Sequence, residues 1–275
     1  MAERNQYDGV IYACYSKLTR STEDFIENHM VGLILSGSIT VINGNDIRTY
    51  QKGELLLYKK NRLAKFIKQP EHEHPFESIC LILDRELLFD FANEQHIENG
   101  YVDRDPEVLV ELTSEPVTEE LFHRLVGETS AGPHEIRKVK MDLVRRLLAN
   151  HPQLKEILFD FSKPWKADLE PFMNRNFRFN IAVSKLAYMT GRSLSTFKRD
   201  FKRIFNATPE RWVQSKRLEE AYYLICGKGK RPVEIYQNVG FESLAHFSYA
   251  FKRFFGVAPS RLVKGHRSKT VSEAC

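Results

Sequence analysis

Hydrophobic residues between positions 31 and 83 come in short runs separated by turn residues. Asn43-Gly44-Asn45 lies between two of these runs, and an Asn-Gly pair in that place is a strong β-hairpin signal. Short strands at roughly ten-residue spacing predict a small β-sandwich or β-barrel. The predicted strands cover residues 31–35, 39–42, 47–50, 55–58, 64–68 and 78–83.

From Asp84 onwards the pattern changes to helical spacing. We expect helices from Asp84 to Ala92 and over residues 118–127, 135–149 and 152–162, with a domain boundary at Ser162-Lys-Pro164. The helix over 135–149 is amphipathic, and its stripe is either a core face of this domain or a dimerisation face. The candidate dimerisation residues are Ile136, Val139, Lys140, Leu143 and Leu147.

The last third of the chain contains an internal repeat. Residues 183–212 and 233–262 align without a gap at an offset of fifty positions, and a repeat of this kind indicates a duplicated supersecondary unit. The identical pairs are Val183/Val233, Ser193/Ser243, Leu194/Leu244, Phe197/Phe247, Phe201/Phe251, Lys202/Lys252, Arg203/Arg253, Phe205/Phe255, Pro209/Pro259 and Arg211/Arg261.

Each copy predicts a short helix, a turn that contains glycine, and a second helix. The first helices are expected over 181–188 and 233–238, and Ser193 and Ser243 have the right residue type to cap the second helices. The phenylalanines of each second helix form one apolar face, opposite a polar and basic face. This is helix-turn-helix organisation, whose second helix fits the DNA major groove.

Position on the second helix suggests the kind of DNA contact. Residues of the first two turns suit base edges, and cations near the helix ends suit phosphates. The phosphate candidates are Ser193, Lys202, Arg203, Ser243, Lys252 and Arg253. A single helix over 209–227, about 27 Å long, would separate the two units. One chain could therefore reach two successive major grooves, which lie about 34 Å apart.

The charge distribution supports a polyanion-binding module. Residues 1–162 contain 19 Lys and Arg against 27 Asp and Glu, a balance of −8. Residues 163–275 contain 22 against 9, a balance of +13. A basic third joined to an acidic remainder is typical of a nucleic-acid-binding domain attached to a domain of another function.

The second copy closely resembles the signature of the AraC/XylS family of bacterial transcription regulators. The matching residues are Ile235, Val239, Gly240, Phe241, Ser243, Phe247, Phe251, Lys252, Phe255, Gly256, Pro259 and Ser260. Tyr236-Gln237 departs from the family, which usually has a small alanine there. The resemblance covers about residues 170–264 and implies base contacts from the second helices. The implied residues are Ser195, Thr196, Lys198, Arg199, Ala245, His246, Ser248 and Tyr249.

The N-terminal part resembles the family's cupin-like sensory domain through Leu35-Ser-Gly-Ser-Ile and Lys52-Gly53-Glu54-Leu-Leu. The overall layout, with Ser195-Thr-Phe-Lys198, resembles the ExsA-type activators of secretion genes, which respond to a protein. The resemblance thus implies an α+β chain. Residues 1–162 would form a sensory or dimerisation domain, and residues 163–275 the DNA-binding domain.

Other candidate sites are weak. Glu71-His72-Glu73-His74-Pro75-Phe76-Glu77 looks metal-like, but Glu77 follows His74 too soon for a cupin metal set, so we expect a solvated loop and no metal. Cys14, Cys80, Cys226 and Cys275 make no C-x-x-C pair. We expect no catalytic residue and no cofactor. The alternative is a cupin-type enzyme or a repair protein fused to a DNA-binding module.

No run of apolar residues is long enough to span a membrane, and the N-terminus lacks an apolar signal region. We therefore expect a cytoplasmic, nucleoid-associated protein. Its expected partners are double-stranded DNA, RNA polymerase and a second copy of the chain. The sequence does not decide whether the effector is a small molecule or a protein.

Overall fold

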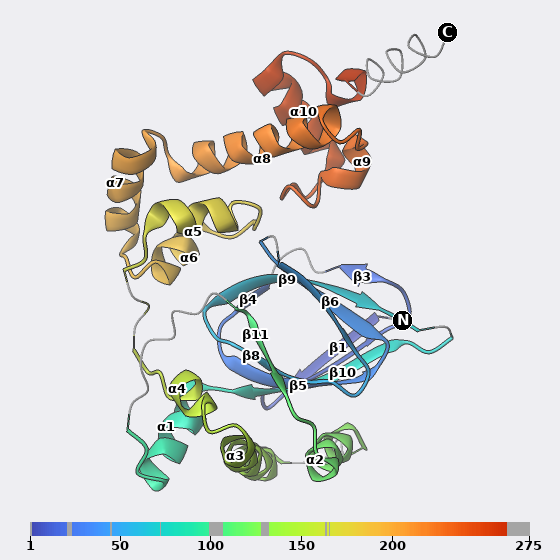
Figure 1. Ribbon diagram of the computed structural model, residues 1–275, viewed down its shortest axis with the longest axis vertical. Helices are drawn as coiled ribbons and strands as arrows, with labels where there is room; N and C mark the ends of the chain where they lie inside the picture. The colour runs from blue at the N-terminus through green and yellow to red at the C-terminus, as the bar shows by residue number, and fades with distance from the viewer. Residues whose placement is uncertain are drawn as a thin grey trace. The chain divides into compact units, whose positions relative to one another are not determined.

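The computed structural model describes residues 2–20, 24–44, 46–71, 73–98, 107–127, 132–162, 164 and 166–262 (Figure 1). The chain divides into two compact units, Met1–Pro164 and Trp165–Cys275. Unit 1 combines β-sheets with helices, and the described part of unit 2 is helical. The chain is thus of the mixed α+β class.

Two antiparallel sheets form the centre of unit 1. The six-stranded sheet has the order β1 (Ala2–Tyr7), β2 (Val10–Tyr15), β10 (Phe76–Leu83), β5 (His29–Ser36), β8 (Leu55–Tyr58) and β11 (Leu109–Leu112). The second sheet has the order β3 (Thr19–Arg20), β9 (Arg62–Gln69), β6 (Ser38–Asn43) and β7 (Asp46–Gln51), and β4 (Asp24–Ile26) also pairs with β9.

Strand alternation explains how unit 1 builds two cores. Side chains such as Ile34 and Leu56 from one sheet meet Ile39 and Phe66 from the other. Their sequence neighbours on β5 and β8 point to the opposite face, because successive strand residues alternate. That face packs on the helices α1 (Arg85–Glu94), α2 (Pro116–Gly127), α3 (Pro133–Asn150) and α4 (Leu154–Leu158). Figure 1 shows α2 and α3 beside the six-stranded sheet.

The amphipathic stripe of α3 lies inside unit 1. Ile136, Leu143 and Leu147 are buried in its core, and Val139 packs against that core. The ammonium group of Lys140 is also buried and donates a hydrogen bond to the Asp8 carbonyl oxygen at 2.9 Å. The sequence left two interpretations of this stripe open. In the structure it is a core face of unit 1.

The structure adds strands that the hydrophobic pattern did not predict, notably β1 and β2. They form a hairpin in which Tyr7 pairs with Val10. Asp8 and Gly9 form its turn with φ of 44° and 75°. An Asp-Gly pair between strands is a strong hairpin signal, but residues 2–7 before it lack an apolar run like those of the predicted strands. The helix expected over 152–162 is limited to α4.

Unit 2 begins with α5 (Leu169–Asn176) and continues with two helix pairs. The first pair is α6 (Val183–Met189) and α7 (Leu194–Phe205), and the second is α9 (Pro232–Ile235) and α10 (Leu244–Phe255). Helix α8 (Pro209–Cys226) joins the pairs. Helices α7 and α10 begin and end at matching positions of the repeat. Helix α9 is shorter than expected, because residues 236–240 form turns.

The two repeats keep separate hydrophobic cores. Phe197 and Phe201 of α7 belong to one core, and Phe247 and Phe251 of α10 belong to the other.

Among the described residues, no helix is sufficiently long and apolar to span a membrane.

Candidate nucleic-acid interface

The first helix-turn-helix unit is fixed at its turn. Gly191 has a positive φ of 63°, which glycine adopts without strain. The Thr190 hydroxyl is buried and donates to the carbonyl oxygens of Leu186 and Ala187. The Ser193 hydroxyl then accepts a hydrogen bond from the Thr196 backbone N–H at 3.3 Å and caps α7.

A buried ion pair secures α7 to this turn. Arg192 Nε lies 3.2 Å from Asp200 Oδ2, and both side chains are at most one-tenth exposed. The Arg192 guanidinium also donates to the carbonyl oxygens of Ala167 and Thr190. The hydrogen bond from Arg192 lowers the pKa of the Asp200 carboxyl below its ordinary value. Neither residue was singled out from the sequence.

The outer face of α7 presents the predicted contact residues to solvent. Phe197 and Phe201 are fully buried, whereas Arg199 and Arg203 have side chains about 76% and 77% exposed. Their distances to Asp200 are 3.9 and 3.8 Å, so their ion pairs with that carboxylate are loose. The other exposed or partly exposed residues on this face are Ser195, Thr196, Lys198 and Lys202.

The second unit repeats this geometry with different chemistry. The Ser243 hydroxyl accepts from the His246 backbone N–H at 3.2 Å, and Gly256 ends α10 in the left-handed conformation, as Asn206 ends α7. The predicted contact residues again lie outside the core. Tyr249 is 66% exposed. Ala245, His246, Lys252 and Arg253 are exposed, and Ser248 is half-buried.

The two outer faces differ at equivalent repeat positions. Ser195, Thr196, Lys198 and Arg199 on α7 correspond to Ala245, His246, Ser248 and Tyr249 on α10. Two cations therefore occupy the second turn of α7 where α10 has a hydroxyl and a phenol. Long cationic side chains hydrogen-bond to guanine in the major groove, which the α10 residues cannot do in the same way.

Helix α8 belongs to both cores. The Trp212 ring lies 5.8 Å from the Phe201 ring and 4.8 Å from the Phe205 ring of α7, between ring centroids. Farther along, Leu218, Ala221 and Ile225 are buried in the core of the second repeat. Its 18 residues correspond to about 27 Å of rise. The helix is therefore a spacer packed on each helix pair.

The metal-like segment of unit 1 contains an isolated backbone bridge and runs into β10 at Phe76. Glu71 and His74 form a bridge through their backbones, with N–H···O distances of 3.2 and 2.9 Å. His72 lies outside the described residues. Within the part of the chain that the structure describes, no three His, Cys, Asp or Glu residues are arranged to hold a metal ion.

The chain is similar to known proteins both in its C-terminal part and over most of its length. A model of the "Helix-turn-helix domain" family matches residues 186–265. The virulence regulon transcriptional activator VirF of Yersinia enterocolitica is 24% identical over 252 residues, or 87% of this chain and 92% of VirF. The HTH-type transcriptional regulator ExsA of Pseudomonas aeruginosa is 24% identical over 242 residues, or 86% of each chain.

Among solved structures, an apo form of a ToxT variant from Vibrio cholerae is similar over 95% of this chain and 98% of its own. The sequence identity in that comparison is 14% and the TM-score is 0.45.

Proposed function

We propose that the chain is a transcription regulator of the AraC/XylS type that activates transcription by reading a bipartite DNA site, which the helix-turn-helix family match and the similarity to VirF and ExsA support. Each helix-turn-helix unit enters one of two successive major grooves on the same face of the duplex. The observation that carries the proposal is the exposed polar face of α7 and of α10. In each helix a serine caps the N-terminus, and the opposite face buries phenylalanine side chains.

We infer that the first unit provides most of the sequence reading. Lys198 and Arg199 can bond to guanine O6 and N7, while Ser195 and Thr196 can reach neighbouring base edges. Ala245, His246, Ser248 and Tyr249 lack an Arg or Gln, so the second unit relies more on backbone contacts and DNA shape. Phosphate contacts come from Lys202, Arg203, Lys252 and Arg253. The amides near Ser193 and Ser243 also face phosphate.

We infer a regulatory role for residues 1–162, as a domain that senses an effector or pairs with a second copy. Activation further implies a contact with RNA polymerase. Because the α3 stripe is buried in its own unit, a homodimer would use another surface of unit 1. The relatives VirF and ExsA, which are an activator and a regulator by name, support a regulatory rather than an enzymatic role.

Selection from genomic DNA tests the proposal. Purified full-length protein is incubated with sheared genomic DNA at physiological salt, and the retained fragments are sequenced. We expect a small set of upstream fragments that share two half-motifs about one helical turn apart. A K198A/R199A variant serves as the control and should lose one half-motif. Uniform retention of all fragments by the wild type would contradict sequence-specific reading.

A further inference from the structure

A buried arginine on α8 connects the two helix-turn-helix units. The Arg217 side chain donates to the carbonyl oxygens of Phe177 and Phe179 at 2.8 and 2.9 Å. It also donates to the Gly240 carbonyl oxygen at 2.7 Å. The first two acceptors lie in the loop before α6, and the third lies in the turn of the second unit. Arg217 is only 9% exposed, so its planar guanidinium group joins the loop before α6 to the turn of the second helix-turn-helix unit away from water.

Two further interactions fasten the same loop, residues 177–180. Arg178 forms a two-pronged ion pair with Glu220 of α8, with nitrogen–oxygen distances of 2.6 to 2.9 Å. Asn180 Nδ2 donates to Glu242 Oε1 at 2.5 Å, just beyond the turn of the second unit. We call the Arg217, Arg178–Glu220 and Asn180–Glu242 interactions together the clamp.

The turn of the second unit is shaped to receive Arg217. Gly240 has a φ of 95°, a conformation that favours glycine. A Cβ at this position would lie 2.7 Å from Arg217 Nε and 2.6 Å from the Arg178 carbonyl oxygen. Only glycine therefore allows both the turn conformation and the approach of the guanidinium group.

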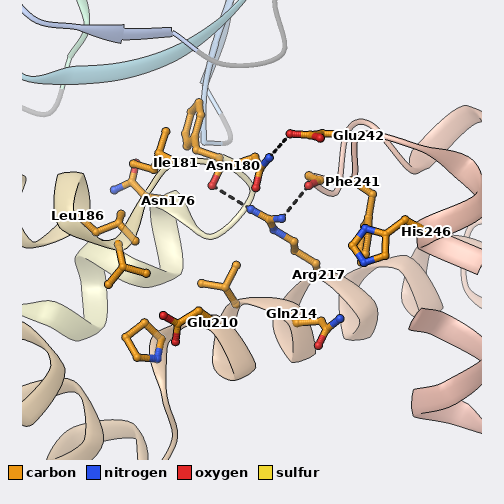
Figure 2. A pocket seen from close by; sticks show the side chains of 15 residues that line it. Asn176, Asn180, Ile181, Leu186, Glu210, Gln214, Arg217, Phe241, Glu242 and His246 are labelled. Atoms are coloured by element: carbon orange, nitrogen blue, oxygen red, sulfur yellow. Dashed lines mark hydrogen bonds between the residues drawn. The ribbon is translucent and has the colours of Figure 1, made fainter. Parts of the chain in front are cut away.

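The clamp lies beside a cleft between the two helix-turn-helix units of unit 2. A cleft of about 360 Å³ separates them, and its walls include Val183 and Leu186 of α6 and Phe241 and His246 of the second unit (Figure 2). Figure 2 shows Arg217 reaching from α8 to carbonyl groups on either side of this cleft. Helix α8 by itself is one connection, about which the units could bend or twist. The clamp adds a second connection away from the helix axis, which restricts both motions.

We propose that Arg217 is a positioning residue that fixes the distance and rotation between α7 and α10. It thereby makes the protein selective for the number of base pairs between two half-sites. This inference rests on the proposed function, because spacing matters only if both units bind DNA. One inserted base pair moves a half-site by about 3.4 Å and rotates it by roughly 35°, which a rigid pair of helices cannot follow.

The first test measures rigidity without DNA. Spin labels are attached to cysteines that replace Ile204 and Phe254, which are exposed and occupy matching repeat positions. The background is full-length protein whose four native cysteines are replaced by serine. Double electron–electron resonance should give a single narrow distance distribution for this protein. The R217M and G240A variants should lose the narrow distribution. Equally narrow distributions in both variants would overturn the proposal.

The second test measures spacing selectivity. The probe is the highest-affinity duplex from the genomic selection, with one or two base pairs inserted or deleted between its half-motifs. Wild-type affinity should fall by about tenfold or more for a single insertion. R217M should bind the original duplex more weakly, and its affinity should change much less with spacing. An unchanged spacing profile in R217M would overturn the proposal.

Matched variants separate positioning from folding. Lys216→Met alters the neighbouring residue of the same helix, whose ammonium pairs with Glu219 at 3.0 Å outside the clamp, and should behave as wild type in both tests. R217K keeps the positive charge and the apolar stem, but its single ammonium group cannot reach all three carbonyl oxygens. If R217M lacks the native helical circular dichroism, R217K is used in its place in both tests. If no duplex is selected, the proposed function fails, while the resonance measurement still decides whether the clamp exists.

Discussion

At the scale of residues, the charge on α7 is arranged in two layers. Asp200 is buried and paired with Arg192, so its negative charge is already compensated inside the unit. The outer cations Arg199 and Arg203 contact it only at 3.8 to 3.9 Å and extend into solvent. Their positive charge is therefore available to an external polyanion.

Alanine substitutions on α7 should distinguish base contacts from phosphate contacts. K198A or R199A should cost about 1–3 kcal/mol of binding and relax the preference at one half-site, because a base contact is lost. K202A should weaken binding to all sequences alike and reduce the salt slope by about one. Titrations at several salt concentrations, with matched and mutated duplexes, measure both effects. Unaltered site preference in K198A and R199A would contradict our assignment.

A buried histidine makes unit 1 sensitive to acid. His29 is 3% exposed, and its Nδ1 lies 3.3 Å from the Lys60 backbone nitrogen. Burial, followed by the nearby charges of Lys60, Arg62 and Lys59, lowers the pKa of His29 from 6.5 to about 3. The unfolded chain takes up a proton near pH 6.5, whereas the folded chain does not. Stability is therefore lost as the pH falls from about 6.5 towards 3.

Replacing His29 should remove this dependence. Between pH 7.5 and pH 5.0 the wild type should lose about 2 kcal/mol of stability through His29. H29N retains an acceptor for the Lys60 N–H, and its stability should change less over the same interval. Thermal unfolding of unit 1 at both pH values is the measurement. H123N, which alters an exposed histidine of α2, should lose as much stability as the wild type.

Residue roles differ in how far the sequence predicts them. The outward positions of Lys198 and Tyr249 follow from helical periodicity, which is local information. Arg217 has the same local signal as any solvent-facing cation. Its three acceptors lie 23 to 40 residues away in the sequence, so its burial depends on the tertiary fold. Asp200 is similar, since its partner is set by the turn.

Among the helices of unit 2, α7 and α10 are each defined by their two ends. Each begins at a serine whose hydroxyl accepts a hydrogen bond from the third helical residue. Each ends at a left-handed residue, Asn206 or Gly256. These signals are local, and the sequence predicts the two serine caps. Pairings between distant segments, such as β11 with β8, have no comparable local signal.

Substitutions at the caps should separate stability from DNA binding. S243A removes the acceptor for the His246 N–H and should lower the free energy of unfolding by about 1 kcal/mol. S243D keeps an acceptor but adds a negative charge near the expected phosphate. It should fold more stably than S243A and bind DNA more weakly. Denaturant titration and DNA titration measure the two effects. If both variants bind DNA as tightly as the wild type, no DNA phosphate lies near Ser243 in the complex.

At the scale of the whole molecule, the two units separate charge as well as structure. The basic residues concentrate in the part that carries the repeat, and the acidic remainder carries the sheets. Like charge repels DNA from the acidic part and directs it to the basic part. This arrangement favours one unit that binds DNA and another that regulates binding.

A fragment of residues 165–275 should therefore fold and bind the selected duplex by itself. We expect the same half-motifs and the same salt slope as for the full-length chain, because all proposed DNA contacts lie in this fragment. Circular dichroism tests folding, and DNA titration tests binding. The Lys198→Ala variant of the fragment is the control and should lose specificity. A folded fragment without sequence preference would contradict the proposed division of labour.

In the function that we propose, one chain reads two successive major grooves, one with α7 and one with α10. Methylation interference on the selected duplex tests it most directly, because it reports guanine N7 atoms in the major groove. We predict two clusters of interfering guanines on one face of the duplex, with centres about 10 base pairs apart. The K198A/R199A variant should lose only one cluster. A single cluster with the wild-type protein, or none, would show that one chain does not read two successive major grooves.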